Sequence, residues 1–407
     1  MISARHRAAI IAAVGIAQIL AWGSSYYLIA VLAEPVARDT GWPLAWIVGG
    51  LSLGFLVSGL VSPRVGRMIE ARGGRGVLAG SAVLLAAGLA LLGLAPNLGV
   101  YVLAWLVLGV GMGAGLYDPA FATLGRLFGE GARSAITQLT LYGGFASTVC
   151  WPLSAWLVAH AGWRGACFGY AAINLLVVMP LYLLAVPSAQ AEQIPEGAGK
   201  AKAHPPPAAA RAPAAVPPGG APYWLLAAVM TLSSVIMTVI SVQLITLMLA
   251  RGASMAAAVG LGALLGPAQV GARLLDMFLA KRHHPVWTLI ASTVLVTAGL
   301  ALLMVRPDLA SAGIVLYGAG SGIRSIARGT VPLALFGAQG YAAVMGRLAM
   351  PSLIGQAAAP AIGGVLVDRL GPSATMVVLF AGAAVAIVPA ATLLAWARPP
   401  IASARAG

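Results

Sequence analysis

The chain has 407 residues, of which 60% are hydrophobic and only 8% are Asp, Glu, Lys or Arg. An ordinary soluble domain carries roughly 25% charged residues, so this composition excludes a soluble globular protein and indicates one embedded in a lipid bilayer. The formal net charge of +14 could suit a nucleic-acid partner, but the cations collect in alternate loops between apolar runs, as in membrane proteins.

Apolar runs long enough to cross a bilayer as helices follow one another along the chain. We expect twelve such helices, at residues 8–33, 43–63, 76–95, 99–127, 134–159, 165–187, 223–250, 255–280, 286–305, 309–336, 344–366 and 373–397. The Pro- and Ala-rich segment 188–222 lacks apolar periodicity and is predicted to be a linker. The predicted fold class is an all-α membrane protein of two six-helix bundles, residues 1–187 and 223–407.

The Lys and Arg residues predict the orientation of these helices. Sixteen of the 24 fall on the side of the N-terminus, five fall on the opposite side, and three lie inside predicted helices. Basic loops are retained in the cytoplasm. We therefore expect both termini and the linker to be cytoplasmic, in a bacterial-type inner membrane, with the protein a monomer in the lipid bilayer.

Two short patterns occur once in each half. Residues 109–113, Gly-Val-Gly-Met-Gly, correspond to residues 318–322, Gly-Ala-Gly-Ser-Gly, and a Leu-Phe-Gly sequence follows each of them, at 127–129 and 335–337. Two six-helix halves related by a parallel repeat are the signature of one large transporter architecture.

The segment after the second predicted helix reads Gly66-Arg67-Met68-Ile69-Glu70-Ala71-Arg72-Gly73-Gly74-Arg75. It resembles the signature loop of the major facilitator superfamily, Gly-x-x-x-Asp-Arg-x-Gly-Arg-Arg, with Glu70 in the Asp position. It departs at Ala71, where the first Arg is expected, so the charge relay between helix ends is expected to be rearranged. The resemblance implies a secondary transporter that works by alternating access. It also implies a gating loop that latches the two halves in one state, formed by Gly66, Arg67, Glu70, Arg72, Gly73 and Arg75; plain cytoplasmic retention of basic residues is the alternative explanation.

The predicted helix 309–336 carries two arginines, Arg324 and Arg328, which share one helix face because they are four residues apart. Each costs roughly 2.5–3.5 kcal/mol at the bilayer centre and cannot deprotonate. They form either a structural ion pair or a binding site for an anion. The repeat places Asp118 at the level of Ile326, between the two arginines, so we expect one arginine to pair with Asp118 and the other to bind substrate. Arg328 is our choice for the ligand, because Gly329 beside it permits close approach.

Arg273 is the third arginine inside a predicted helix. It resembles the substrate-facing arginine of the eighth helix in the monocarboxylate and oxalate/formate porters. An alternative alignment pairs Arg273 and Asp276 with Arg67 and Glu70, which places Arg273 in an inner latch. The antiporter motif of drug exporters is not clearly present in the fifth helix, where residues 143–152 arrange Gly and Pro differently.

In the superfamily, the first, fourth, seventh and tenth helices line the central cavity. This resemblance adds polar and aromatic side chains of those helices to the candidate site: Gln18, Tyr26, Tyr27, Tyr117 and Gln243. In the fourth helix, Pro119 follows Asp118 and is expected to bend the helix, because proline removes a backbone donor.

Three arginines against Asp118 and Asp276 within the helices favour an anionic substrate, and a small organic carboxylate is the first candidate. The alternative is a drug or metabolite efflux antiporter driven by protons that enter at Asp118. A receptor or a membrane-embedded enzyme is disfavoured, because the sequence has no soluble domain and no nucleophile–base set. We expect no enzymatic activity, no cofactor, no metal and no nucleic-acid partner.

Overall fold

The structure is a computed structural model that describes residues 3–188, 219–279 and 283–397. Within these ranges the chain is helical and contains no strand, which confirms the predicted all-α fold class. The linker prediction falls almost entirely on residues 189–218, which lie outside the described ranges.

The helices form two groups that follow each other in the chain. The first group contains α1 (Ala4–Gly23), α2 (Ile29–Thr40), α3 (Leu44–Arg72), α4 (Gly74–Leu94), α5 (Leu98–Gly115), α6 (Tyr117–Phe128), α7 (Ala132–Gly144), α8 (Ala146–Ile173) and α9 (Met179–Ala185). A short π-helical turn, Asn174–Val178, joins α8 to α9. The second group contains α11 (Ala221–Leu249), α12 (Met255–Leu279), α13 (Pro285–Val305), α14 (Ala310–Phe336) and α15 (Tyr341–Thr392).

Eight helical segments of the described chain are long and apolar enough to cross a membrane. Two of them, Leu98–Ala185 with 88 residues and Tyr341–Trp396 with 56, far exceed the roughly 20 residues that one crossing needs. Gly162 (φ 69°) and Gly371 (φ 81°) break these segments with left-handed backbone that only glycine adopts easily. Each long segment therefore turns back on itself, and the count of twelve crossings stays a prediction.

Three helices that the sequence predicts as continuous are broken. The predicted helix 134–159 is interrupted at Phe145, between α7 and α8, and two others are broken near their middle. The first breaks between α1 and α2, at a turn over residues 24–28, and this break was not expected from its apolar run. The other breaks at Leu116, between α5 and α6. Pro119 has no N–H, so the Gly115 carbonyl loses its helical donor, and Gln18 Nε2 donates to that carbonyl at 2.6 Å. The expected bend at Pro119 is thus confirmed.

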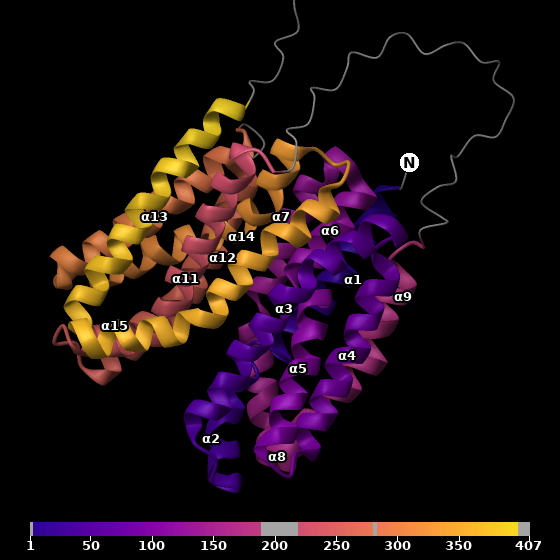
Figure 1. The fold of residues 1–407 in the computed structure, drawn as a ribbon, viewed down its shortest axis with the longest axis horizontal. Helices are drawn as coiled ribbons and strands as arrows, with labels where there is room; N and C mark the ends of the chain where they lie inside the picture. Colours follow the sequence, from indigo (N-terminus) through magenta and orange to yellow (C-terminus); the bar gives the residue numbers. More distant parts are fainter. Residues whose placement is uncertain (1–2, 189–218, 280–282, 398–407) are drawn as a thin grey trace, which may run out of the picture.

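The two groups of helices meet at one side and separate toward the other (Figure 1). They meet where α3 ends and α15 begins, which we call the gate side. Here one hydrophobic cluster contains residues of both groups, with Tyr341 and Met345 of α15 packed among Ile69 and Phe121. Toward α2, α8 and the bend of α15 the groups diverge in Figure 1. The halves therefore share a core at the gate side.

Candidate transport site and gate

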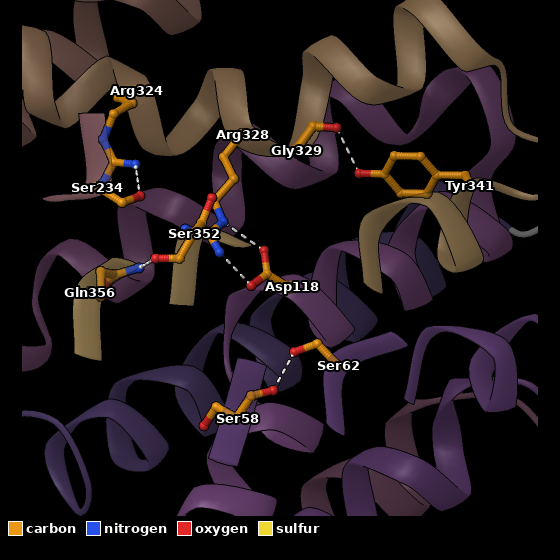
Figure 2. A network of polar contacts seen from close by, with 10 residues as sticks. All are labelled: Ser58, Ser62, Asp118, Ser234, Arg324, Arg328, Gly329, Tyr341, Ser352 and Gln356. Atoms are coloured by element: carbon orange, nitrogen blue, oxygen red, sulfur yellow. Dashed lines mark hydrogen bonds and ion pairs between the residues drawn. The ribbon is translucent and has the colours of Figure 1, made fainter. Parts of the chain in front are cut away.

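Asp118 and Arg328 form an ion pair between the two halves (Figure 2). Arg328 Nε lies 2.7 Å from Asp118 Oδ1, and Nη2 lies 2.7 Å from Oδ2. The side chain of Arg328 is only 14% exposed, and that of Asp118 is only 11% exposed. The two parallel bonds match the fork of a guanidinium to a carboxylate, and Asp118 also lies in the first turn of α6, where the helix dipole favours an anion. The expected charge pair across the centre is confirmed.

Arg324, one turn earlier on α14, has no carboxylate partner in the described part of the chain. Its side chain is buried, Nη1 donates to Ser234 Oγ at 3.2 Å, and Nη2 lies 2.9 Å from Met237 Sδ. Its Nε is buried without a hydrogen-bond partner among the described residues. A buried guanidinium that lacks an anion is costly, so Arg324 is the arginine whose charge remains to be compensated.

The structure shows which of the two arginines pairs with Asp118. Arg328 was our choice for the substrate ligand, but the structure pairs it with Asp118. The reason lies in Gly329: a Cβ there would meet Ile136 at 2.7 Å and Phe121 at 3.0 Å. Glycine at this position lets α14 approach α6 and α7, which brings Arg328 against Asp118, and it does not open space for a substrate.

Arg273 is buried on α12 and joins the halves through backbone carbonyls. Its Nη1 donates to Thr140 O of α7 at 2.8 Å, and its Nε donates to Gly322 O of α14 at 3.1 Å. Asp276, one turn later, accepts a bond from Thr288 Oγ1 at 3.1 Å and is not hydrogen-bonded to Arg273. Arg273 thus bridges the halves, as the inner-latch alternative requires, but from an embedded position.

The Gly143-Gly144 pair at the end of α7 makes room for two candidate residues. A Cβ on Gly143 would clash with the Tyr117 hydroxyl, and a Cβ on Gly144 would lie 2.7 Å from Arg273 Nη1. We did not predict this role from the sequence. The two consecutive glycines in the sequence could have indicated a close approach of neighbouring side chains at this point.

The predicted residues of the first and fourth helices form one aromatic cluster. The ring of Trp22 lies 5.5 Å from that of Tyr26 and 5.0 Å from that of Tyr117, and the rings of Tyr26 and Tyr27 are 4.9 Å apart. Gln18 Oε1 accepts a bond from Trp22 Nε1 at 3.2 Å. Four of the five predicted residues of this set are thereby brought together.

Gln243 is set apart from that cluster. It is half-buried on α11, and its side chain packs against Gly363 of α15. Among the described residues, no hydrogen bond joins it to the aromatic cluster.

A small cavity of about 40 Å³ lies between the halves beside the ion pair. This space holds only a few water molecules, since one needs roughly 10–15 Å³ of such volume. Residues of both halves line it, including Trp22, Phe55, Tyr117, Asp118, Arg328 and Gln356. The space beside the ion pair is therefore too small for an organic substrate in this conformation.

Glu70 holds the gate side together. Its Oε1 accepts from Gly340 N at 3.2 Å and its Oε2 accepts from Ala342 N at 3.1 Å, at the start of α15. The first N–H groups of a helix lack partners within it, and the helix dipole favours a negative charge there. Nearby, α3 and α15 cross where the backbones of Gly66 and Gly346 touch, and a Cβ on either would lie 3.0 Å from the Cα of the other.

The gating segment differs from the expected loop in two respects. Residues 66–72 form the last turns of α3, and Gly73, with φ 78°, is the one residue between α3 and α4. The second difference concerns the cations: Arg67 and Arg72 are exposed, and Arg75 is half-buried. Within the described chain, none of the three donates a hydrogen bond to Glu70. The Glu70 carboxylate therefore binds backbone N–H groups at the start of α15, while Arg126 donates to the Glu70 carbonyl.

Sequence reasoning did not identify Met237 beside Arg324, nor the N–H groups that bind Glu70. An apolar thioether on a membrane helix looks like any lipid-facing or core residue. Backbone donors depend on which helix end faces the carboxylate, and the sequence carries no signal for that.

The sequence is similar to a known protein family and to one curated protein. Residues 14–282 match the sequence profile of the family described as the Major Facilitator Superfamily. A relative from Thermoproteus tenax, an uncharacterized 38 kDa protein in the 23S RNA operon, is 32% identical over 167 residues, which are 41% of this chain and 44% of that protein. The match thus spans less than half of that relative's length.

Solved structures share the fold at low sequence identity. The human organic anion transporter MFSD10 (TETRAN) superposes with a TM-score of 0.72 at 15% identity, covering 94% of this chain and 99% of that chain. The Escherichia coli fucose:proton symporter FucP gives 0.66 at 12% identity, with 93% and 97% covered. The proton:xylose symporter XylE bound to 6-bromo-6-deoxy-D-glucose gives 0.68 at 12% identity, with 97% and 96% covered. Since the family profile matches more than half of the chain, this multi-pass membrane protein belongs to the Major Facilitator Superfamily of transporters.

Proposed function

We propose that the protein is a secondary transporter for a small organic anion, a carboxylate in the first instance, and that Arg324 binds the anionic group. The observation that carries the proposal is the buried guanidinium of Arg324, which meets only Ser234 and Met237 and keeps one donor unpaired among the described residues. Removing the partner of a buried charge costs several kcal/mol, roughly 3–5 when the site is dry. An anion supplied by the substrate would compensate this charge.

In this proposal the pair of Arg328 and Asp118 couples binding to the movement of the halves. The pair joins α14 to α6, so it must break or exchange partners when the centre opens. A proton delivered to Asp118 would neutralise the carboxylate and release Arg328, which gives protons a route into the cycle. The gate side, which we assign to the cytoplasm with both termini, is closed here, and the transporter would face the opposite side of the inner membrane.

A second candidate is a proton-driven efflux antiporter for drugs or metabolites. One observation favours it: the central cavity combines the acidic Asp118 with the apolar rings of Trp22, Phe55 and Tyr117. Such a lining suits an uncharged or cationic apolar solute, and Asp118 would then be its proton-carrying group.

Counterflow in proteoliposomes separates the two candidates. Vesicles loaded with unlabelled lactate or oxalate should accumulate the labelled acid, and Arg324→Gln should abolish this exchange while Arg324→Lys retains it at reduced affinity, because lysine keeps the charge but loses the fork. Arg38→Gln is the matched control, since Arg38 forms an exposed pair with Glu34. Transport of a lipophilic cation such as ethidium, with no carboxylate counterflow, would contradict the anion assignment and support efflux.

A further inference from the structure

The aromatic residues beside the arginines form a continuous series. Tyr117 stacks on Phe121, with ring centroids 5.2 Å apart and planes 9° apart. From Tyr117 the series continues through Trp22 and Tyr27, and Tyr27 lies 6.0 Å from Trp151. We call Trp22, Tyr26, Tyr27, Tyr117 and Trp151 the aromatic track.

The inner end of the track lies at the charged centre. Tyr117 is the residue before Asp118, and Trp22, Phe55 and Tyr117 line the same small cavity as Asp118 and Arg328. The cavity thus combines aromatic side chains with a charged pair, and Arg324 lies one helical turn before Arg328 on α14.

The outer end of the track reaches an open groove. Trp151 lines a groove of about 590 Å³ between α2 and α8, together with Val31 and Ser147. The side chain of Trp151 is 47% exposed. Ring contacts from Trp151 through Tyr27 and Trp22 to Tyr117 therefore join this groove to the charged centre.

The track does not have the burial of an ordinary core. Trp22, Tyr26, Tyr27 and Tyr117 are all half-buried, whereas Phe121 at the inner end is fully buried. The break at residues 24–28 brings the consecutive rings of Tyr26 and Tyr27 to 4.9 Å, an approach that a regular helix does not give to neighbouring side chains. The helix is therefore broken at the place where its aromatic residues face the interior.

We infer that the transported anion carries a flat aromatic body, so that its carboxylate meets Arg324 while its ring packs against the aromatic track. This inference rests on the proposed anion site and adds the second half of the substrate. Aromatic pairs add about 0.5–1.5 kcal/mol beyond the burial of their area, or roughly two- to tenfold in affinity per favourable pair.

The test compares benzoate, cyclohexanecarboxylate and acetate by isothermal titration of the purified full-length protein. We expect benzoate to bind at least about tenfold more tightly than acetate, because only benzoate can stack on the track. Cyclohexanecarboxylate, similar in size but not flat, should fall between them. Trp22→Leu should reduce the preference for benzoate and leave acetate affinity within about threefold of wild type.

Two control variants separate the loss of the aromatic ring from misfolding and from the loss of an indole elsewhere. Trp22→Phe retains a ring and should restore most of the preference if Trp22→Leu folds poorly. Trp46→Leu removes an indole that is 61% exposed on α3, outside the track, and should change nothing. Equal binding of benzoate and acetate, with both lost in Arg324→Gln, would overturn the aromatic inference and leave the anion site standing. Binding of neither acid by the wild type would overturn the anion site, and this inference with it.

Discussion

Arg328 on α14 and Asp118 on α6, separated by 210 residues in the chain, meet in a two-point ion pair at the centre of the molecule. Both distances are 2.7 Å, and little of either side chain is exposed. Each residue comes from a different half, so the ion pair can form only while the two halves are in contact at the centre. Arg324, one turn away, has no such partner among the residues that the structure describes.

Removing one member of the pair should destabilise the protein. Asp118→Asn leaves Arg328 buried without its anion, at a cost of about 3–5 kcal/mol if the site is dry and less if water enters. Thermal unfolding of the purified protein should therefore show a lower Tm for Asp118→Asn, and the combination with Arg328→Gln should recover much of the loss. Additive losses in the double variant would show that the two residues do not depend on each other.

The contact of Glu70 predicts a change in rate with little change in affinity. Glu70→Gln keeps a side-chain acceptor but loses the charge at the start of α15, which is worth about 0.3–1 kcal/mol and up to 2 in partly buried geometry. The gate should open more often, so the turnover rate should change while the Kd for the anion stays near wild type. Glu130→Gln, an exposed acid on the same side, is the control. An affinity loss as large as that of Arg324→Gln would assign Glu70 to the binding site.

The crossing of Gly66 and Gly346 predicts a steric effect on gate closure. A methyl group on Gly346 would clash with the Ser62 carbonyl and press on the Gly66 backbone, and rigid backbone cannot yield as a side chain can. Gly346→Ala should increase the distance between spin labels placed on the two halves at the gate side. Gly80→Ala on α4, where a Cβ meets nothing within 4 Å, should leave that distance unchanged. Unchanged distances in Gly346→Ala would contradict the tight crossing.

His284 predicts a loss of stability in acid. Its Nδ1 accepts a bond from Val286 N at 3.3 Å and so caps α13. Burial lowers the pKa of His284, and the charge of Arg133 lowers this pKa further. Because the folded pKa lies below the unfolded value of about 6.5, the capping contribution is complete above that pH and is lost as the pH falls through the folded pKa.

The measurement is Tm between pH 8 and pH 5. His284→Asn still offers a capping oxygen but does not titrate, so its Tm should fall less steeply below pH 6.5 than that of the wild type. Parallel Tm curves for the two proteins would show that His284 contributes nothing to the acid sensitivity.

The sequence predicted the helices well where apolar runs end at polar or Pro residues. The range 286–305 became α13 at Pro285–Val305, and 309–336 became α14 at Ala310–Phe336. It did not predict the break at residues 24–28, because the first apolar run continues through it. Pro119 did predict the second break. Proline has no N–H, so the carbonyl four residues earlier loses its helical hydrogen bond.

The site was predictable in part for similar reasons. The sequence repeat placed Asp118 at the same membrane depth as the two arginines. An ion pair between Asp118 and one of them was therefore predictable. Which arginine pairs depends on how α14 packs on α6 and α7 at Gly329, a detail of the packed structure. The partners of Glu70 are backbone groups, which no residue pattern reveals.

We propose that Arg324 binds the anion and that Arg328 does not. Titration calorimetry with the carboxylate that gives counterflow should compare Arg324→Gln with the paired variant Arg328→Gln/Asp118→Asn, which removes both charges of the ion pair together. Loss of a charge-assisted bond costs about 1.5–3 kcal/mol, so Arg324→Gln should raise the Kd roughly 10- to 100-fold, whereas the paired variant should stay within about threefold of wild type. Wild-type affinity in Arg324→Gln, with binding lost in the paired variant, would show that the Arg328–Asp118 pair, and not Arg324, holds the anion.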